Sequence, residues 1–213
     1  VIACQTNNNP CIYYKMLNSN SGAQSNPKPA FVFLDEGNGN GIVINERDSA
    51  NYGNIGLNAV DLSYSGSPST INGATGDYSR AIGVSSNASG DYSTAMGEYT
   101  KASAFASTAM GSGSRAEGAA STAMGYYTDA TGNYSTAMGY YANATGNYSR
   151  AMGYFTNASG GSSTAIGDYT SASGYNSIAM GYDTEASGGS STAIGSNTSA
   201  SGSSSTAMGS NTV

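Results

Sequence analysis

The residue types that carry most enzyme chemistry are absent from this sequence or scattered along it. The chain has no histidine, so it can form neither a Ser–His nucleophile pair nor an imidazole metal site. Glycosidases need two carboxylates facing each other across a cleft, whereas the acidic residues between positions 91 and 185 form no recurring face. We therefore predict that the protein is not an enzyme. A polysaccharide depolymerase embedded in a fibre is a less favoured alternative.

One short stretch looks like the start of a calcium-binding loop. In EGNGNG, from Glu36 to Gly41, oxygen-bearing side chains follow the spacing with which an EF-hand begins. The glutamate that should close such a loop is replaced by Arg47. We interpret the stretch as the turn of a hairpin between the apolar strands of AFVFLDEGNGNGIVINE. We predict no metal site and no cofactor.

The cysteines and the charges restrict the surroundings of the protein. Cys4 and Cys11 are the only cysteines, and an even number without histidine favours one disulfide in an oxidising compartment, with two free thiols as the alternative. Only 9% of residues are charged and the formal net charge is −6. The absence of a basic cluster argues against nucleic acid. The sequence contains no run of 18 apolar residues of the kind that spans a membrane.

A 14-residue repeat dominates the sequence. Copies begin at a serine every 14 residues from Ser79 to Ser205, without insertion, which gives nine full copies and a partial tenth. Position 3 is always Ala, position 5 is always Gly, and position 4 is always Met or Ile. A fixed period is typical of a solenoid, in which each coil stacks on its neighbours. Because the chain starts at Val1 and ends part-way through a repeat, we expect it to be part of a longer chain.

The repeat favours strands over helices, because two glycines per copy would cost each helix about 2 kcal/mol. We predict two short strands per coil, near positions 1–5 and 8–12, with glycine in or beside both turns. Alternation then directs the small residues at positions 1, 3, 5, 8, 10 and 12 to the interior. The larger side chains at positions 2 and 4 point outward. Coils stacked about 4.8 Å apart predict a rod of roughly 45–50 Å.

The pattern S-x-A-[MI]-G-x-x-x-x-A-x-G resembles the head repeats of YadA-like trimeric autotransporter adhesins, and related repeats occur in phage and large-virus fibre proteins. The resemblance covers about residues 74–213. It implies an all-β fold, a left-handed parallel β-roll (solenoid) of 14-residue coils, with three chains side by side in an extracellular fibre. Position 2 departs from the family, since it is mainly Thr here and usually Val there. The family's stalk and membrane anchor are not in this stretch, so autotransport is unsupported.

Residues 1–73 do not repeat. We predict that they form a small N-terminal β cap or connector, followed by the β-roll of residues 74–213. A cap is expected because the terminal coil of a solenoid exposes unpaired backbone, which invites aggregation. A small receptor-binding tip is the functional alternative for this region.

The apolar side chains at position 4 predict an interface between chains. Alanine fills the interior, so these side chains must lie outside, in a continuous apolar stripe. Full burial of ten such side chains is worth on the order of 15–30 kcal/mol per chain. We therefore predict a parallel homotrimer with position 4 facing the shared axis and Thr at position 2 near the rim. The predicted interface residues are Ile82, Met96, Met110, Met124, Met138, Met152, Ile166, Met180, Ile194 and Met208.

Aromatic residues recur at positions 6 and 7 of consecutive copies. Stacked along the coils, they would stabilise the edge of the sheet by about 0.5–1.5 kcal/mol per pair. Binding of sugar rings or of another surface is the functional alternative. These residues are Tyr126, Tyr127, Tyr140, Tyr141, Tyr154 and Phe155.

These observations predict a structural and adhesive segment of a trimeric fibre on a cell, filament or virion surface. Its expected partners are further copies of itself, with end-to-end stacking as an option, and a host-surface glycan or matrix protein. A viral or phage fibre that binds host glycans is the alternative. Ice binding ranks lower, because the threonines at positions 2 and 8 lie on different strands with opposite facing.

Overall fold

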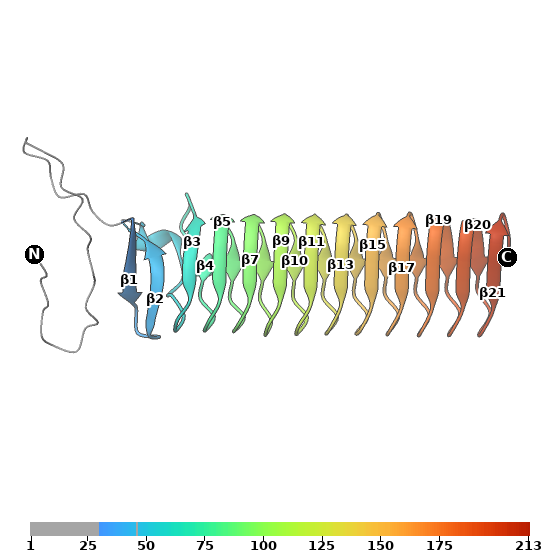
Figure 1. Ribbon diagram of the computed structural model, residues 1–213, viewed down its shortest axis with the longest axis horizontal. Coiled ribbons are helices and arrows are strands. Elements are labelled where there is room, and N and C mark those ends of the chain that lie inside the picture. The colour runs from blue at the N-terminus through green and yellow to red at the C-terminus, as the bar shows by residue number, and fades with distance from the viewer. Residues whose placement is uncertain (1–29, 46) are drawn as a thin grey trace, which may run out of the picture.

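The computed structural model describes residues 30–45 and 47–213, which form one long stack of strands (Figure 1). It is a β-solenoid of about 12 turns with 14-residue spacing. The only helical element in the described residues is the short 3-10 turn η1, Ser49–Asn51. No described helix is therefore long enough to cross a membrane.

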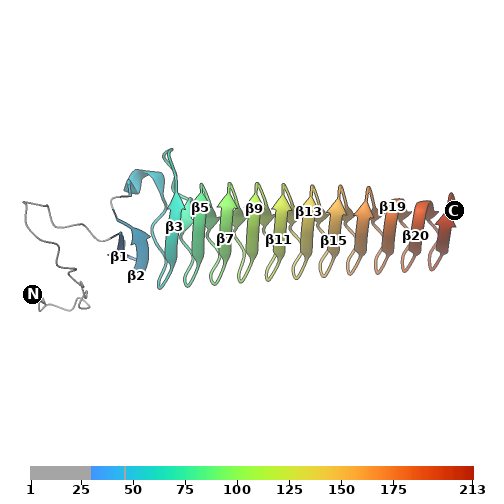
Figure 2. The same cartoon turned by 45° about the horizontal axis from the view of Figure 1, so that its top comes forward.

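Each coil contributes one long strand to a parallel sheet. The long strands cover positions 2–6 of the repeat, and the strands of successive coils pair in register, so that Met124 lies opposite Met138 and Met138 opposite Met152. Figures 1 and 2 show these strands side by side along the rod. Their bounds are β5 Arg80–Val84, β7 Thr94–Glu98, β9 Thr108–Ser112, β11 Thr122–Tyr126, β13 Thr136–Tyr140, β15 Arg150–Tyr154, β17 Thr164–Asp168 and β21 Thr206–Ser210.

A second strand in each coil covers positions 9 and 10 and pairs in parallel with its counterparts in the neighbouring coils. The prediction of two strands per coil is confirmed, although the second is shorter than expected. In the two coils before β21, the long and the short strand merge into one, β19, Ile178–Ala186, and β20, Thr192–Ala200. The short strands are β4 Gly73–Ala74, β6 Asn87–Ala88, β8 Lys101–Ala102, β10 Arg115–Ala116, β12 Asp129–Ala130, β14 Asn143–Ala144, β16 Asn157–Ala158 and β18 Ser171–Ala172.

The N-terminal part joins the same sheet. Strands β1, Phe31–Asp35, and β2, Asn40–Ile44, form the predicted antiparallel hairpin. Strand β2 then pairs in parallel with β3, Val60–Tyr64, which pairs in parallel with β5. The long-strand sheet therefore starts before the repeats do. The predicted disulfide between Cys4 and Cys11 lies outside the described residues.

The interior is filled by small side chains, as predicted. The alanines at positions 3 and 10 are fully buried in almost every coil, and so are the serines at position 1. The threonines at position 8, such as Thr100 and Thr128, are buried as well. The position-8 threonines therefore do not form a second exposed row beside the threonines at position 2, as ice binding would need.

The prediction that the glycines at position 5 lie in the interior is wrong. These glycines are half-buried or exposed. Their φ angles lie between +108° and +138°, which breaks the strand alternation after position 4. A Cβ on Gly97 would collide with the carbonyl oxygen of Gly111 in the next coil. The close approach of neighbouring backbones thus requires glycine there.

The turns are made by residues that are rarely left-handed. Positions 7 and 14 adopt φ near +50° to +60° and are often tyrosine, for example Tyr141 (φ +51°) and Tyr148 (φ +60°). The N–H of Tyr141 donates to the carbonyl of Tyr126, and that of Tyr148 to the carbonyl of Asn133, in the preceding coil. These bonds between coils offset the cost of the left-handed conformation. Apart from Gly113, which is at position 7 with a φ of +66°, the glycines of the repeats lie beside these left-handed turn residues and not at them.

Candidate functional site

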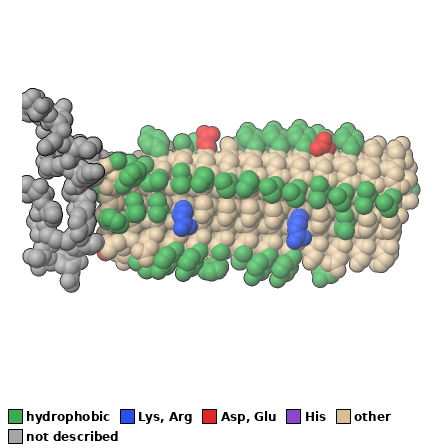
Figure 3. All heavy atoms as spheres, in the orientation of Figure 1, with side chains coloured by type: hydrophobic (Ala, Val, Ile, Leu, Met, Phe, Trp, Pro, Cys, Tyr) green, Lys and Arg blue, Asp and Glu red, His purple; other side chains and the backbone are tan. Residues whose placement is uncertain are grey.

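The outer face of the long-strand sheet carries a continuous row of hydrophobic side chains. None of the ten Met and Ile side chains at position 4 is buried, and Met96, Met124 and Met180 are each 36% exposed. Because the strands pair in register, these side chains line up along the rod (Figure 3). We call this row the apolar stripe. The structure thus brings the predicted interface residues together on one outer surface.

The hydrophobic surface widens at the N-terminal end. Phe31 lies opposite Ile44 on the hairpin, and Phe33 lies opposite Ile42, which pairs with Val60 in β3. The first pair extends the position-4 row and the second extends the position-2 row, which elsewhere is mostly threonine. Phe31 and Phe33 are each 55% exposed. Sequence reasoning missed this extension because the 14-residue period does not reach the hairpin.

The predicted aromatic residues form two ladders on the edge of the rod. In the position-6 ladder the rings of Tyr126, Tyr140 and Tyr154 stack with centroids 5.1 Å apart and interplanar angles of 7° and 12°. In the position-7 ladder, Tyr127, Tyr141 and Phe155 stack at 5.4 and 5.1 Å. The latter ladder continues to Tyr169, 5.6 Å from Phe155, which was not among the predicted residues.

Stacking determines which part of each ring is accessible. The six predicted rings are 39–49% exposed, but the faces of the inner rings cover one another. Ring edges and phenol hydroxyls therefore meet the solvent, and a free face is left only where a ladder ends. A similar stack at position 14, on the other turn, joins Tyr134 to Tyr148 at 5.1 Å.

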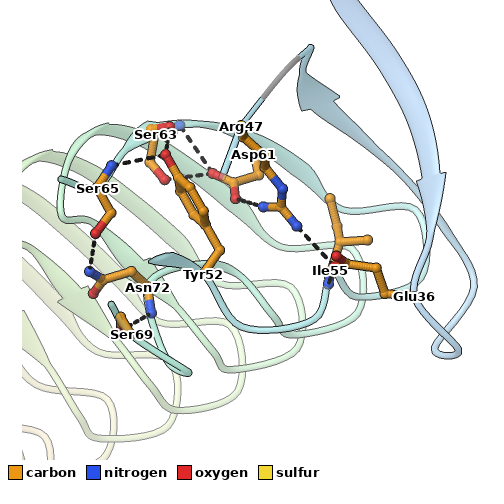
Figure 4. Close-up of polar contacts among 9 residues, drawn as sticks. All are labelled: Glu36, Arg47, Tyr52, Ile55, Asp61, Ser63, Ser65, Ser69 and Asn72. Carbon is orange, nitrogen blue, oxygen red and sulfur yellow. Dashed lines mark hydrogen bonds and ion pairs between the residues drawn. The ribbon is translucent and has the colours of Figure 1, made fainter. Parts of the chain in front are cut away.

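A buried polar cluster lies at the N-terminal end (Figure 4). Asp61 occupies the β3 position where the repeats have alanine, and it is 2% exposed. Arg47 donates to Asp61 at 2.6 Å and to Glu36 at 2.9 Å. The backbone N–H and the hydroxyl of Ser63 donate to the same Asp61 carboxylate. Burial raises the pKa of Asp61, and the bonds from Ser63 and the charge of Arg47 oppose that rise.

Tyr52 completes this cluster. Its hydroxyl donates to the carbonyl of Ser63 and accepts from the N–H of Ser65, and Arg47 lies 4.7 Å from the centre of its ring. An open pocket of about 360 Å³ lies beside these residues. The polar groups of the cluster mainly bind one another, which is typical of a structural site.

The calcium-like stretch is a hairpin turn, as predicted. The Asp35 carboxylate accepts hydrogen bonds from the N–H groups of Gly37 and Gly39. The Glu36 carboxylate binds Arg47 and the N–H of Ile55. Within the described ranges, no group of three or more acidic or cysteine side chains could hold a metal ion.

Two acidic residues of the repeats, Glu117 and Asp129, belong to an ion-pair cluster on and directly beside the short strands. Glu117 accepts from Lys101 at 2.7 Å and from Arg115 at 2.8 Å, and Arg115 lies 3.8 Å from Asp129. The bond from Lys101, together with that from Arg115, holds the pKa of Glu117 below its ordinary value. Glu117 lies between the two cations, and Asp129 in the next coil faces Arg115, so each cation has an acidic partner.

The parallel stack of short coils, its alanine interior and its exposed apolar stripe define a structural β-solenoid. Five consecutive stretches match the family described as YadA head domain repeat (2 copies), at residues 74–99, 102–128, 130–156, 158–184 and 186–212. They span more than half of the chain, so the chain belongs to the YadA head repeat family. Such repeats are typical of structural adhesin proteins. No curated protein matches the chain.

Proposed function

We propose that this chain is a segment of a surface-exposed adhesive fibre, on a cell, filament or virion, in which three copies pack in parallel along the apolar stripe. The observation that carries the proposal is the stripe itself, an uninterrupted outer row of Met and Ile along the repeats. The described residues before β5 lie at one end of the stack (Figure 1), so they do not cover it. A long apolar surface of this kind marks an interface.

The energy available to this interface follows from the exposed part of each side chain. Full burial of a Met or Ile side chain is worth about 1.5–3 kcal/mol. Met124 is 36% exposed in the single chain, so about 0.5–1 kcal/mol per residue remains to be gained. Six of the ten residues are less exposed than Met124, so the stripe gives at most on the order of 5–10 kcal/mol per chain, which is less than the full-burial figure but still substantial. Burial of the exposed side chains of Phe31 and Phe33 at the N-terminal end would add to this free energy.

The test is the oligomeric state in solution. Native mass spectrometry or sedimentation of the unmodified protein should report three chains. Replacing Met124 and Met138 with Lys should dissociate them, because the lysines would be buried without partners. Thr131→Lys with Thr145→Lys is the matched control, since these exposed threonines lie in the same repeats but off the stripe. A folded monomer of the unmodified protein would contradict the proposal.

We also propose that the N-terminal hairpin and the Asp61 cluster cap the solenoid. Val43 and Ile55 are 1% exposed and replace the small interior residues of the repeats with larger ones at this end. The buried Arg47–Asp61 pair lies beside them. Deleting residues 1–45 should uncover the edge of β3 and cause concentration-dependent association, which light scattering would detect. Unchanged scattering would contradict the capping role.

For adhesion, we propose that the position-6 ladder contacts glycans through its hydroxyls and ring edges. Support comes from the exposure of Tyr126, Tyr140 and Tyr154 and from the mutual covering of their ring faces. Changing these three residues to Phe keeps the stack and removes only the hydroxyls. Retention on a glycan array should then fall, whereas Tyr134→Phe with Tyr148→Phe on the other turn should leave it unchanged. Equal retention of the wild type, the triple variant and the control would refute this contact. In the alternative of a viral or phage fibre, the same surface would bind host glycans.

A further inference from the structure

Four charged side chains stand out on the outer face of the long-strand sheet. Among positions 2, 4 and 6 of strands β5 to β21, the charged residues are Arg80 and Arg150 at position 2 and Glu98 and Asp168 at position 6. All four are exposed. None of them makes an ion pair with another described residue, unlike the other arginines in the described residues and Lys101.

These charges lie on opposite sides of the apolar stripe. Position 4 separates positions 2 and 6 on every strand, so the arginines flank the stripe on one side and the acids on the other. Figure 3 shows basic side chains on one side of the hydrophobic row and acidic ones on the other. Positions 2 and 6 are about 13 Å apart along a strand. That distance is too long for an ion pair across the stripe within one chain.

The two pairs share one spacing along the rod. Glu98 is in the coil that follows Arg80, and Asp168 is in the coil that follows Arg150. The axial offset is therefore one coil in both cases, or about 4.8 Å. The long, flexible arginine side chain can span such an offset.

Symmetry decides which sides meet when stripes of two copies face each other. A rotation about an axis parallel to the rod brings the position-2 side of one copy against the position-6 side of its neighbour. Arginines then meet acids. An antiparallel arrangement brings position 2 against position 2, and arginines then meet arginines. The charges therefore complement a second copy of this chain only in the parallel sense.

We infer that Arg80 and Arg150 of one copy pair with Glu98 and Asp168 of the next copy around the trimer. This inference rests on the proposed parallel trimer, gives an electrostatic reason for its direction and limits its register. Exposed ion pairs add little to affinity, so burial of the stripe holds the copies together. The ion pairs instead exclude antiparallel packing and oppose sliding, because a shift by three coils in either direction separates both pairs by two coils or more.

Cross-linking tests the contact directly. In a background with Cys4→Ser and Cys11→Ser, the variant carrying Arg150→Cys and Asp168→Cys is treated with a short bis-maleimide. A denaturing gel should then show covalent trimers, because each copy is linked to both neighbours. The matched control carries Arg150→Cys and Glu98→Cys, which are four coils or about 19 Å apart along the rod. The control should remain uncross-linked.

The outcomes separate this inference from the proposed function. If native mass shows three chains but the Arg150→Cys/Asp168→Cys variant does not cross-link, the register is wrong and the trimer stands. If cross-linking stops at covalent dimers, the arrangement is two-fold, and both the pairing around a trimer and the trimer itself are overturned. If the unmodified protein is a monomer, both proposals fail.

Charge reversal gives a second readout that does not depend on the cysteine variants. Arg80→Glu with Arg150→Glu should lower the melting temperature of the assembly by several degrees, and adding Glu98→Arg with Asp168→Arg should restore it. The deficit should vanish in about 1 M salt, where the Debye length is about 3 Å. Glu185→Arg, an exposed reversal away from this face, is the control. No deficit, or no restoration, would overturn the inference.

Discussion

The carbonyl oxygen of Gly153 occupies the place where a side chain of Gly139 would begin. Gly139 also has a φ of +129°, a conformation that only glycine adopts readily. We predict that Gly139→Ala destabilises the protein by at least about 2–3 kcal/mol, because it combines a backbone collision with strain. Chemical denaturation measures this loss. Gly189→Ala is the control, since a Cβ there meets nothing within 4 Å, and an equal loss in both variants would contradict the explanation.

Ala120 adopts a φ of +51° at a turn without an aromatic ring to stack. For a residue with a Cβ this conformation costs about 1–2 kcal/mol. Ala120→Gly should therefore raise the free energy of unfolding by about 1 kcal/mol. The neighbouring change Ala119→Gly should lower it by about 0.5–1 kcal/mol, because Ala119 has no positive φ and only backbone entropy changes. Denaturation curves in which both variants shift the same way would refute the prediction.

Buried hydroxyls at position 8 differ in their hydrogen bonds. Thr128 donates to the hydroxyl of Ser114 at 2.9 Å, whereas the hydroxyl of Thr156 has no partner in the described structure. Thr128→Val should cost about 1 kcal/mol, and Thr156→Val should be neutral or stabilising. Ala142 shows that an apolar residue fits this position. Thermal unfolding of the two variants would reveal the difference, and a larger loss for Thr156→Val would disprove it.

The ion-pair cluster around Glu117 makes stability depend on pH. Its lowered pKa means that the folded state favours the carboxylate. The resulting stabilisation is complete above the ordinary glutamate pKa of about 4.3 and is lost as the pH falls through the lowered value. Glu117→Gln should remove this part of the acid sensitivity.

Burial of Asp61 changes the pH dependence of stability in the opposite direction. Because burial raises the pKa of Asp61, the folded state gains stability as the pH falls from the raised pKa to the ordinary aspartate pKa. The informative quantity is therefore the difference in melting temperature between wild type and Glu117→Gln. That difference should shrink below about pH 4.3. A difference that grows on acidification would contradict the assignment.

The sequence by itself determined the architecture of the repeats. A constant 14-residue period with Ala at two positions of opposite strands requires narrow stacked coils. Strand alternation then leaves Met124 and its equivalents outside, where the structure has them. The aromatic ladders followed from the same period, since equal positions in adjacent coils lie one strand spacing apart. These features depend only on local alternation and on the repeat length.

Only the tertiary structure decided how the turns and the ends are built. The left-handed backbone at Tyr141 and the exposed glycine at Gly139 depend on hydrogen bonds and close contacts with neighbouring coils. In β3, Asp61 takes the place of an alanine, and its buried carboxylate is paired by Arg47, 14 residues earlier in the chain. Contacts between coils, and contacts between the N-terminal segments, join residues that are not neighbours in the sequence. A one-dimensional pattern indicates which residues repeat, but it does not indicate which backbone atoms approach one another.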